Sequence, residues 1–265
     1  MKKILLTGST GFIGSELLKK LSHNNLIFIT LRKKNNLFSN NKNIKKIYFN
    51  NYDKLNNSLK KLSIDTVIHC ATHYVKHHEY DDIKKLTDSN ILFGNIILEN
   101  LDKMKVKKFI NFSTVWENYN AKKDDCFNLY SVYKKNFSNL INFYKKKSQN
   151  TKFFNLVISD TFGENDNRMK LVNLLRLNFK NNKSTTIISK KLILNLLNVL
   201  DILGAVNLIL QKKINPDTYV LKNTVDYSIL DIINKINRGS LKKIKVKWTS
   251  NKILKERIYN YKQIK

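Results

Sequence analysis

The sequence predicts an α/β fold in which a doubly wound parallel sheet is followed by a small C-terminal lobe. Apolar runs without polar alternation recur along the chain, as expected of strands that are buried on both faces. Segments in which apolar residues have helical spacing lie between these runs up to residue 160. Three of the seven glycines, Gly8, Gly11 and Gly14, fall between the first apolar run and the first helical segment, where a strand must turn into a helix.

The first 160 residues carry this alternation of strands and helices. We expect strands at Ile4–Leu6, Leu26–Leu31, Asp65–Cys70, Phe109–Phe112 and Phe153–Ser159. We expect helices at Ser15–Ser22, Asn90–Leu101 and Tyr130–Tyr144. The polar, Asn- and Lys-rich segment Asn35–Lys46 is predicted to be a long surface loop.

Beyond residue 160 the predicted elements are too short to form an independent core. We expect helices at Met169–Phe179, Asp201–Leu210 and Ile229–Ile236, and strands at Thr185–Ser189, Tyr219–Leu221 and Ile244–Trp248. We therefore predict one domain over residues 1–160, completed by 190–215. Residues 161–189 and 216–265 are predicted to form a small lobe over one edge of the sheet.

The composition excludes several classes of protein. Hydrophobic residues make up 42% of the chain and aromatic residues 11%, which excludes a disordered protein. The net charge is +29, but 44 of the 49 basic residues are lysines spread along the whole chain, whereas nucleic-acid recognition depends on arginine. Polar residues interrupt the most apolar stretch, Leu192–Leu210, and two cysteines form no disulfide framework. We therefore expect a cytoplasmic protein with no nucleic-acid partner and no membrane span.

The glycine cluster predicts a binding site for a dinucleotide. Glycines at a strand-to-helix turn permit a positive φ angle and a close approach of the backbone to a pyrophosphate. The amino end of the following helix adds amide donors and partial positive charge. We expect this turn to bind the cofactor through Gly8, Thr10, Gly11, Phe12, Ile13 and Gly14.

A tyrosine and a lysine on the helix predicted over 130–144 form the second motif. Tyr130 and Lys134 are four residues apart and share one helix face. A neighbouring ammonium lowers the pKa of a phenol, which suits the tyrosine to proton transfer near neutral pH. We expect Tyr130 to transfer the proton and Lys134 to adjust the pKa of Tyr130.

Four histidines and a cysteine gather in one short stretch after the strand predicted over 65–70. They are His69, Cys70, His73, His77 and His78. A metal site is one interpretation, but no carboxylate or thiol pair has the spacing of metal ligands. We expect no metal here.

Together these motifs resemble the extended short-chain dehydrogenase/reductase family, also called the NAD-dependent epimerase/dehydratase family, whose members mostly act on nucleotide sugars. Within it, the closest pattern is that of the CDP-paratose/abequose synthase-like nucleotide-sugar 4-ketoreductases. The matching stretches are Cys70-Ala-Thr-His-Tyr-Val-Lys-His77, Ser89-Asn-Ile-Leu92, Phe109-Ile-Asn-Phe112 and Tyr130-Ser-Val-Tyr-Lys134. The resemblance implies a Rossmann-type doubly wound sheet with a small C-terminal substrate-binding lobe.

The resemblance also implies roles for individual residues. Thr114, Tyr130 and Lys134 would be catalytic, with Thr114 orienting the substrate carbonyl and Lys134 also holding the nicotinamide ribose. Further cofactor contacts are expected at Asn51, Cys70, Ala71 and Thr72, in addition to Tyr130 and Lys134. Substrate contacts are expected at Tyr74, His77, Thr114 and Phe162. A homodimer would form through Asn90–Leu101 and Tyr130–Tyr144.

The residues around these motifs indicate the cofactor and the reaction. Arg32 and Lys33 follow the second predicted strand without a nearby acid, which favours the 2′-phosphate of NADPH over the free hydroxyl of NADH. Family dehydratases have Asp-Glu after their Thr, whereas Val115 and Trp116 follow Thr114 and cannot act as acid or base. Asp160 departs from the family pattern, because a carboxylate facing a pyrophosphate would repel it.

We therefore expect NADPH-dependent reduction of a nucleotide-linked 4-keto-(di)deoxy sugar, in deoxysugar biosynthesis for surface glycans. Two alternatives stay open. One is a nucleotide-sugar 4-epimerase that retains NAD. The other is a catalytically silent member that binds a dinucleotide.

Overall fold

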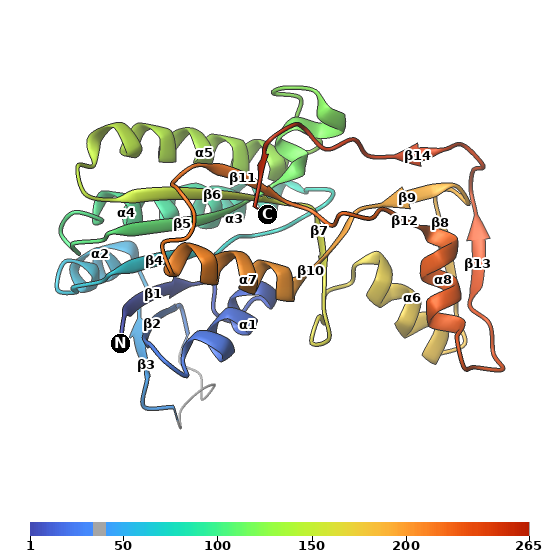
Figure 1. The fold of residues 1–265 in the computed structure, drawn as a ribbon, viewed down its shortest axis with the longest axis horizontal. Helices are drawn as coiled ribbons and strands as arrows, with labels where there is room; N and C mark the ends of the chain where they lie inside the picture. The colour runs from blue at the N-terminus through green and yellow to red at the C-terminus, as the bar shows by residue number, and fades with distance from the viewer. Residues whose placement is uncertain (34–40, 265) are drawn as a thin grey trace.

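The computed structural model describes residues 1–33 and 41–264. Within them, eight parallel strands form the central sheet, in the order β15-β11-β6-β5-β4-β1-β2-β3 (Figure 1). Their bounds are β1 Lys3–Thr7, β2 Leu26–Leu31, β3 Ile44–Tyr48, β4 Thr66–His69, β5 Lys108–Thr114, β6 Lys152–Ile158, β11 Thr218–Leu221 and β15 Lys262–Gln263. The chain runs outward from β1 to β3 and then crosses back to β4, so the order reverses between β1 and β4. Ligands of doubly wound sheets bind in the crevice at such a reversal, beyond the carboxyl ends of the strands.

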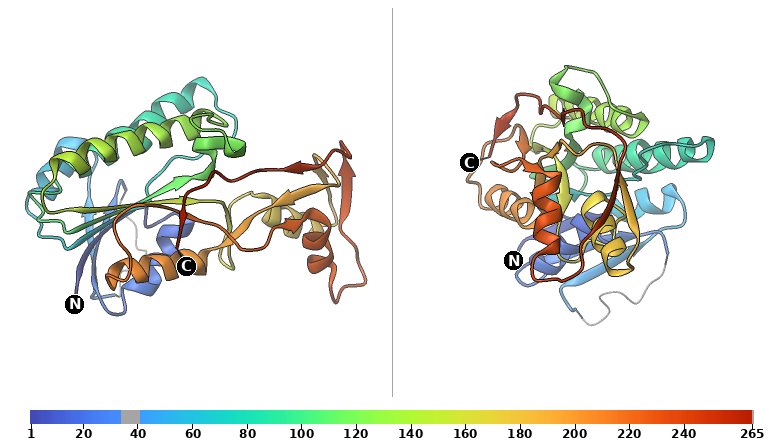
Figure 2. Two further views of the ribbon diagram at one scale, coloured as in Figure 1. Left: turned by 45° about the horizontal axis from the view of Figure 1, so that its top comes forward. Right: turned by 90° about the vertical axis from the view of Figure 1, so that its right-hand side faces the viewer.

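Helices cover both faces of this sheet (Figure 2). One layer contains α1 (Phe12–Leu21) and α7 (Val199–Leu210), and the other contains α2 (Tyr52–Leu59), α4 (Phe93–Glu99) and α5 (Leu129–Lys147). Side chains of β1 point alternately to the two layers, because Ile4 and Leu6 pack with α1 and α7 while Leu5 packs with α2, α4 and α5. This alternation explains why Ile4, Leu5 and Leu6 form a run with no polar residue.

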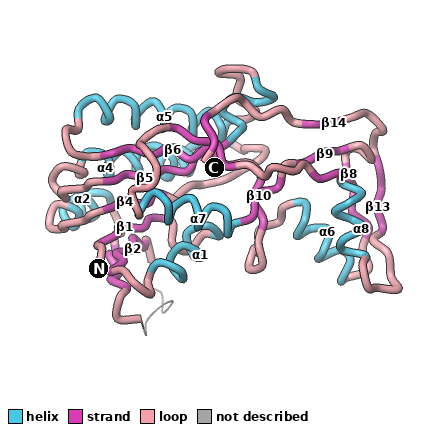
Figure 3. Tube along the Cα trace, in the orientation of Figure 1, coloured by secondary structure: helices cyan, strands magenta, loops and turns pink. Residues whose placement is uncertain are grey.

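The lobe extends away from the sheet and has a small core of its own (Figure 3). It contains α6 (Leu171–Lys180), α8 (Ile229–Asn237), β8 (Ser184–Ile187), β9 (Leu192–Leu194), β12 (Tyr227–Ser228), β13 (Lys245–Trp248) and β14 (Leu254–Lys255). A parallel pair, β7 (Asp160–Phe162) and β10 (Leu196–Asn198), joins it to the sheet. After β14 the chain returns to the sheet and ends beside β11 as β15.

Several elements differ from the sequence-based expectations. The prediction of a loop over residues 35–46 is wrong at its end, because residues 44–46 lie in β3, where Ile44 is buried. Residues 35–40 lie outside the described residues. Helices α2 and α3 (Tyr80–Thr87) were not predicted, because each buries at most two side chains. Strand β11 lies in the main sheet beside β6 rather than in the lobe, and its Val220 and Leu221 are buried.

Two helical segments bear on the site described next. Helix α3 continues through one π turn, η1 (Asp88–Leu92), into α4. A 3-10 segment, η2 (Val115–Ala121), follows β5 directly. No helix in the described part of the chain is both long and apolar enough to cross a membrane.

Candidate active site

The turn between β1 and α1 requires glycine at two positions. Gly8 has a φ angle of +67°, and a Cβ there would lie 2.6 Å from the amide nitrogen of Ala71. A Cβ on Gly14 would lie 2.1 Å from the carbonyl oxygen of Gly8. Helix α1 begins after Gly11, and no side chain caps its amino end. Its first amide groups are therefore available to an anion.

A cavity of about 610 Å³ opens at the carboxyl ends of the sheet strands beside this turn. It brings together fifteen of the residues that the sequence singled out: Gly8, Thr10, Gly11, Phe12, Ile13, Gly14, Arg32, Lys33, Cys70, Ala71, Thr72, Tyr74, Thr114, Tyr130 and Lys134. The glycine turn and the tyrosine–lysine pair, more than a hundred residues apart in sequence, thus share one cavity. A turn that a Cβ would fill, next to free helix amides, fits the pyrophosphate of a dinucleotide.

Three residues singled out from the sequence do not line this cavity. Asn51 is exposed and caps helix α2, where its side chain accepts a hydrogen bond from the Lys54 amide. His77 is exposed in the loop before α3. Phe162 packs against the core of the lobe. Their ligand contacts therefore stay predictions.

The start of helix α5 fixes the tyrosine and the lysine. Asn128 and Ser131 form a reciprocal capping box, which places Tyr130 in the first turn and Lys134 one turn later. Thr114 ends β5, and its hydroxyl accepts a hydrogen bond from the Trp116 amide. The hydroxyl proton of Thr114 stays available to a substrate oxygen in the cavity.

Burial dominates the protonation of this pair. It raises the pKa of Tyr130, and the Thr72 hydroxyl opposes the shift through a hydrogen bond. Burial also lowers the pKa of the Lys134 ammonium to about 8, against the opposing influence of Glu117. The expectation of a lowered pKa for Tyr130 beside Lys134 is therefore wrong in sign for the protein by itself, because burial outweighs the surrounding charges. Its phenol stays protonated at neutral pH, which suits a proton donor.

An asparagine from the π turn positions the loop that faces Tyr130. The buried Asn90 side chain accepts hydrogen bonds from the amide of His73 (2.6 Å) and from the Thr72 hydroxyl (3.2 Å), and donates to the His73 carbonyl (2.9 Å). The next residue, Tyr74, meets the Tyr130 ring edge-on at a centroid distance of 5.0 Å. Asn90 thereby holds the loop whose Thr72 and Tyr74 side chains contact Tyr130.

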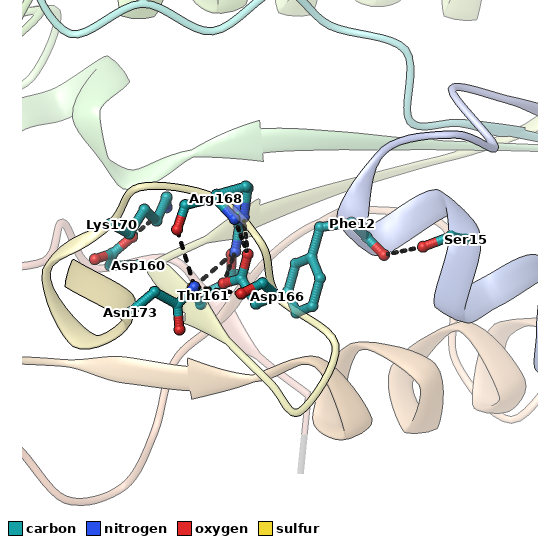
Figure 4. Close-up of polar contacts among 8 residues, drawn as sticks. All are labelled: Phe12, Ser15, Asp160, Thr161, Asp166, Arg168, Lys170 and Asn173. Atoms are coloured by element: carbon teal, nitrogen blue, oxygen red, sulfur yellow. Dashed lines mark hydrogen bonds and ion pairs between the residues drawn. The ribbon is translucent and has the colours of Figure 1, made fainter. Parts of the chain in front are cut away.

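Two cations that the sequence analysis did not single out line the cavity near the lobe. Arg168 donates to both carboxylate oxygens of Asp166 at 2.7 Å and to the Thr161 carbonyl at 2.9 Å (Figure 4). Its guanidinium lies over the Phe12 ring, 4.3 Å from the centroid. Lys170 forms an ion pair with Asp160. The carboxylate of Asp160, expected to repel a pyrophosphate, is therefore neutralised by a neighbouring lysine.

His69, the last residue of β4, has structural partners. The buried His69 ring packs against Phe93, Phe109 and Phe137, and burial lowers its pKa to about 3. The Thr7 hydroxyl lies 3.0 Å from its Nδ1. Within the described residues, no group of three His, Cys, Asp or Glu side chains could hold a metal ion.

A model of the NAD-dependent epimerase/dehydratase family matches residues 4–221. The chain belongs to this family. The resemblance drawn from the glycine turn and the Tyr130–Lys134 pair is thereby confirmed. CDP-abequose synthase from Yersinia pseudotuberculosis is 26% identical over 248 residues, which cover 89% of this chain and 83% of that protein. CDP-abequose synthase from Salmonella muenchen is 27% identical over 183 residues, which cover 69% of this chain and 61% of that protein.

Solved structures of the epimerase type share the fold of this family member. UDP-glucuronic acid 4-epimerase from Bacillus cereus, in complex with UDP-glucuronic acid and NAD, gives a TM-score of 0.78 at 24% identity and covers 94% of this chain and 86% of that chain. UDP-N-acetylglucosamine 4-epimerase from Methanobrevibacter ruminantium, in complex with UDP-N-acetylmuramic acid, gives a TM-score of 0.80 at 18% identity and covers 95% of this chain and 86% of that chain. The expected Rossmann-type fold is thereby confirmed.

Proposed function

We propose that this protein reduces the keto group of a nucleotide-linked 4-keto-(di)deoxy sugar with NADPH, as a step in deoxysugar biosynthesis for surface glycans. The observation that carries the proposal is the one cavity that holds the glycine turn, Thr114, Tyr130 and Lys134 together. The curated relatives named CDP-abequose synthase support a nucleotide sugar as the substrate.

The protonation of the site supports reduction. When bound, NADPH supplies a hydride to the carbonyl carbon, and negative charge develops on the carbonyl oxygen. Thr114 donates a hydrogen bond to this oxygen, and Tyr130 gives it a proton. Because burial raises the pKa of Tyr130, the phenol carries the proton that this step consumes. The Lys134 ammonium stabilises the phenolate that remains.

The cofactor preference follows from the end of β2. Arg32 and Lys33 line the cavity there, and Asp160, at the other end of the cavity, is its one acidic residue within the described part of the chain. Two cations suit the 2′-phosphate of NADPH. Fluorescence titration should give tight NADPH binding, weak NADH binding and a loss of this preference in Arg32→Ala. Equal binding of the two cofactors by the unmodified protein would contradict the assignment.

The substrate diphosphate would bind beside the lobe. Arg168 and Lys170 line this end of the cavity, and their side chains are already oriented by Asp166 and Asp160. Lys170 has three N–H donors, so it would bind a phosphate while it stays paired with Asp160, and its side chain is ordered beforehand. Lys170→Met should raise the KM for a 4-keto nucleotide sugar and leave the affinity for NADPH unchanged.

A nucleotide-sugar 4-epimerase is the second candidate. The supporting observation is the fold shared with 4-epimerase structures, one of which contains NAD. An epimerase oxidises and re-reduces its substrate within one turnover, so it would purify with NAD and form product without added NADPH. A silent dinucleotide-binding member would bind NADPH and turn over no keto sugar.

A further inference from the structure

A buried carboxylate lies between the two elements that carry the catalytic side chains. Glu117 follows Thr114 by three residues in η2 and is 3% exposed. Its carboxylate accepts hydrogen bonds from the Ser138 hydroxyl at 3.3 and 3.4 Å and from the backbone of Thr114. Ser138 follows Lys134 by one helical turn on α5, so both side chains lie on the face that Glu117 contacts. Glu117 thereby links the end of β5 to the catalytic face of α5.

A second cavity, of about 240 Å³, lies on the other side of this carboxylate. Glu117, Lys135, Ser138, Asn155 and Tyr261 are among its lining residues. Lys134 lines the active-site cavity but not this one, and Glu117 lines this one but not the active-site cavity. The lysine and the glutamate therefore line separate cavities, although their charges interact.

We propose that Glu117 is a positioning residue, the internal counter-charge that keeps Lys134 protonated, and that it exchanges protons with solvent through the second cavity rather than through the substrate site. Its effect on turnover rests on the proposed function, whereas its effect on the charge of Lys134 does not.

The groups around the pair support this assignment. The titratable groups that act on Lys134 are Glu117, Cys70 and His69. Those that act on Glu117, or respond to it, are Lys134, Lys135, Cys126, Tyr130 and Tyr261. Burial raises the pKa of Glu117 and lowers the pKa of Lys134, and the charge of each group opposes the shift of the other.

Neutralising Glu117 should lower the pKa of Lys134. Among the groups that raise the pKa of Lys134, Glu117 has the largest effect, and it opposes the effect of burial. The isosteric Glu117→Gln removes this charge and leaves burial unopposed, so the pKa of Lys134 falls. An opposite charge at close range typically shifts a pKa by about 1–3 pH units. We therefore expect the Lys134 titration to move down by about one pH unit or more.

The test follows Lys134 by NMR in protein with 13C at the lysine ε-carbons. Its signal is identified by its loss in Lys134→Met, and its chemical shift is followed against pH without substrate. Asp124→Asn is the matched control, because Asp124 is exposed and pairs with Lys135, the next residue, at 2.7 Å. We expect the midpoint to fall in Glu117→Gln and to stay in place in Asp124→Asn. An unchanged midpoint in a folded Glu117→Gln protein would overturn the proposal.

Ser138→Ala tests the same proposal if Glu117→Gln does not fold. Ser138→Ala removes a hydrogen bond that lowers the pKa of Glu117, so the carboxylate is less ionised and the Lys134 midpoint falls by a smaller amount. If turnover is measurable, its decline at high pH should move down in parallel; a merely structural role would lower turnover equally at all pH values. A shifted midpoint without turnover would refute the reductase but not this role of Glu117. Turnover with an unshifted midpoint would refute this role but not the reductase.

Discussion

Replacing Gly14 by alanine should abolish tight cofactor binding through one atomic contact. The added Cβ would lie 2.1 Å from the carbonyl oxygen of Gly8, whereas carbon and oxygen atoms in close contact stay about 3.3 Å apart. The turn and the start of α1 must therefore separate by about 1 Å. The contacted oxygen belongs to the backbone of Gly8, so the contact cannot be relieved by rotation of a side chain.

This displacement should weaken both binding and stability. A shift of about 1 Å in a positioned group can cost about 100-fold, and we expect a loss of that size in NADPH affinity. Overpacking of this kind costs about 1–3 kcal/mol in the free energy of unfolding. Fluorescence titration and denaturant unfolding measure the two effects.

Gly204 supplies the matched control. It is also a helical glycine, but it is exposed in α7, and a Cβ there meets no atom within 4 Å. Gly204→Ala should raise the free energy of unfolding by about 0.5–1 kcal/mol, through helix propensity, and leave NADPH binding unchanged. The reasoning is refuted if Gly14→Ala binds NADPH as tightly as Gly204→Ala does.

Three further predictions concern other parts of the molecule. Tyr130→Phe should lose about 10²–10⁴-fold in turnover while NADPH binding survives in the same titration, and near-normal turnover would contradict its role as proton donor. Asn90→Ala leaves the backbone of His73 without its partners, so denaturant unfolding should show a loss of about 1–3 kcal/mol; an unchanged stability would mean that Asn90 does not hold this loop. Burial lowers the pKa of Lys108 to about 8 in the folded protein. Between this pH and the ordinary lysine pKa of about 10.4, the unfolded chain binds more protons than the folded protein, so the contribution of Lys108 to stability rises with pH. Unfolding at pH values across this window should therefore show a weaker rise in Lys108→Met, and equal slopes would contradict the shift.

The sequence was sufficient for the parts of the fold that bury apolar runs on both faces. Strands β1, β2 and β5 and helix α5 were predicted because their apolar spacing stands out against an Asn- and Lys-rich chain. Helix α3 was not, because a chain rich in polar residues leaves it one buried side chain, Leu86. Strand β11 was assigned to the wrong unit, because nothing in its four residues shows that it pairs with β6, about sixty residues earlier.

The candidate site was predictable where a motif is local in sequence. The glycine turn and the Tyr130–Lys134 pair each lie within eight residues, and their spacing is visible without a structure. Arg168 and Glu117 were missed because tertiary packing alone brings them to the site, one over Phe12 and the other beside α5. The pKa of Tyr130 was predicted with the wrong sign, because the effect of burial cannot be read from sequence spacing.

The most direct test of the proposed reduction is the transfer of deuterium from NADPH. The purified protein is incubated with NADPH deuterated at the transferred position and with 4-keto-6-deoxy sugars linked to CDP, UDP or dTDP. We predict that one of them gains one deuterium at the former carbonyl carbon for each NADPH consumed, and that Tyr130→Phe loses this reaction. Inversion at C4 of a nucleotide sugar that carries a 4-hydroxyl, without added NADPH, would contradict the account and identify an epimerase. NADPH binding without any product would identify a silent member of the family.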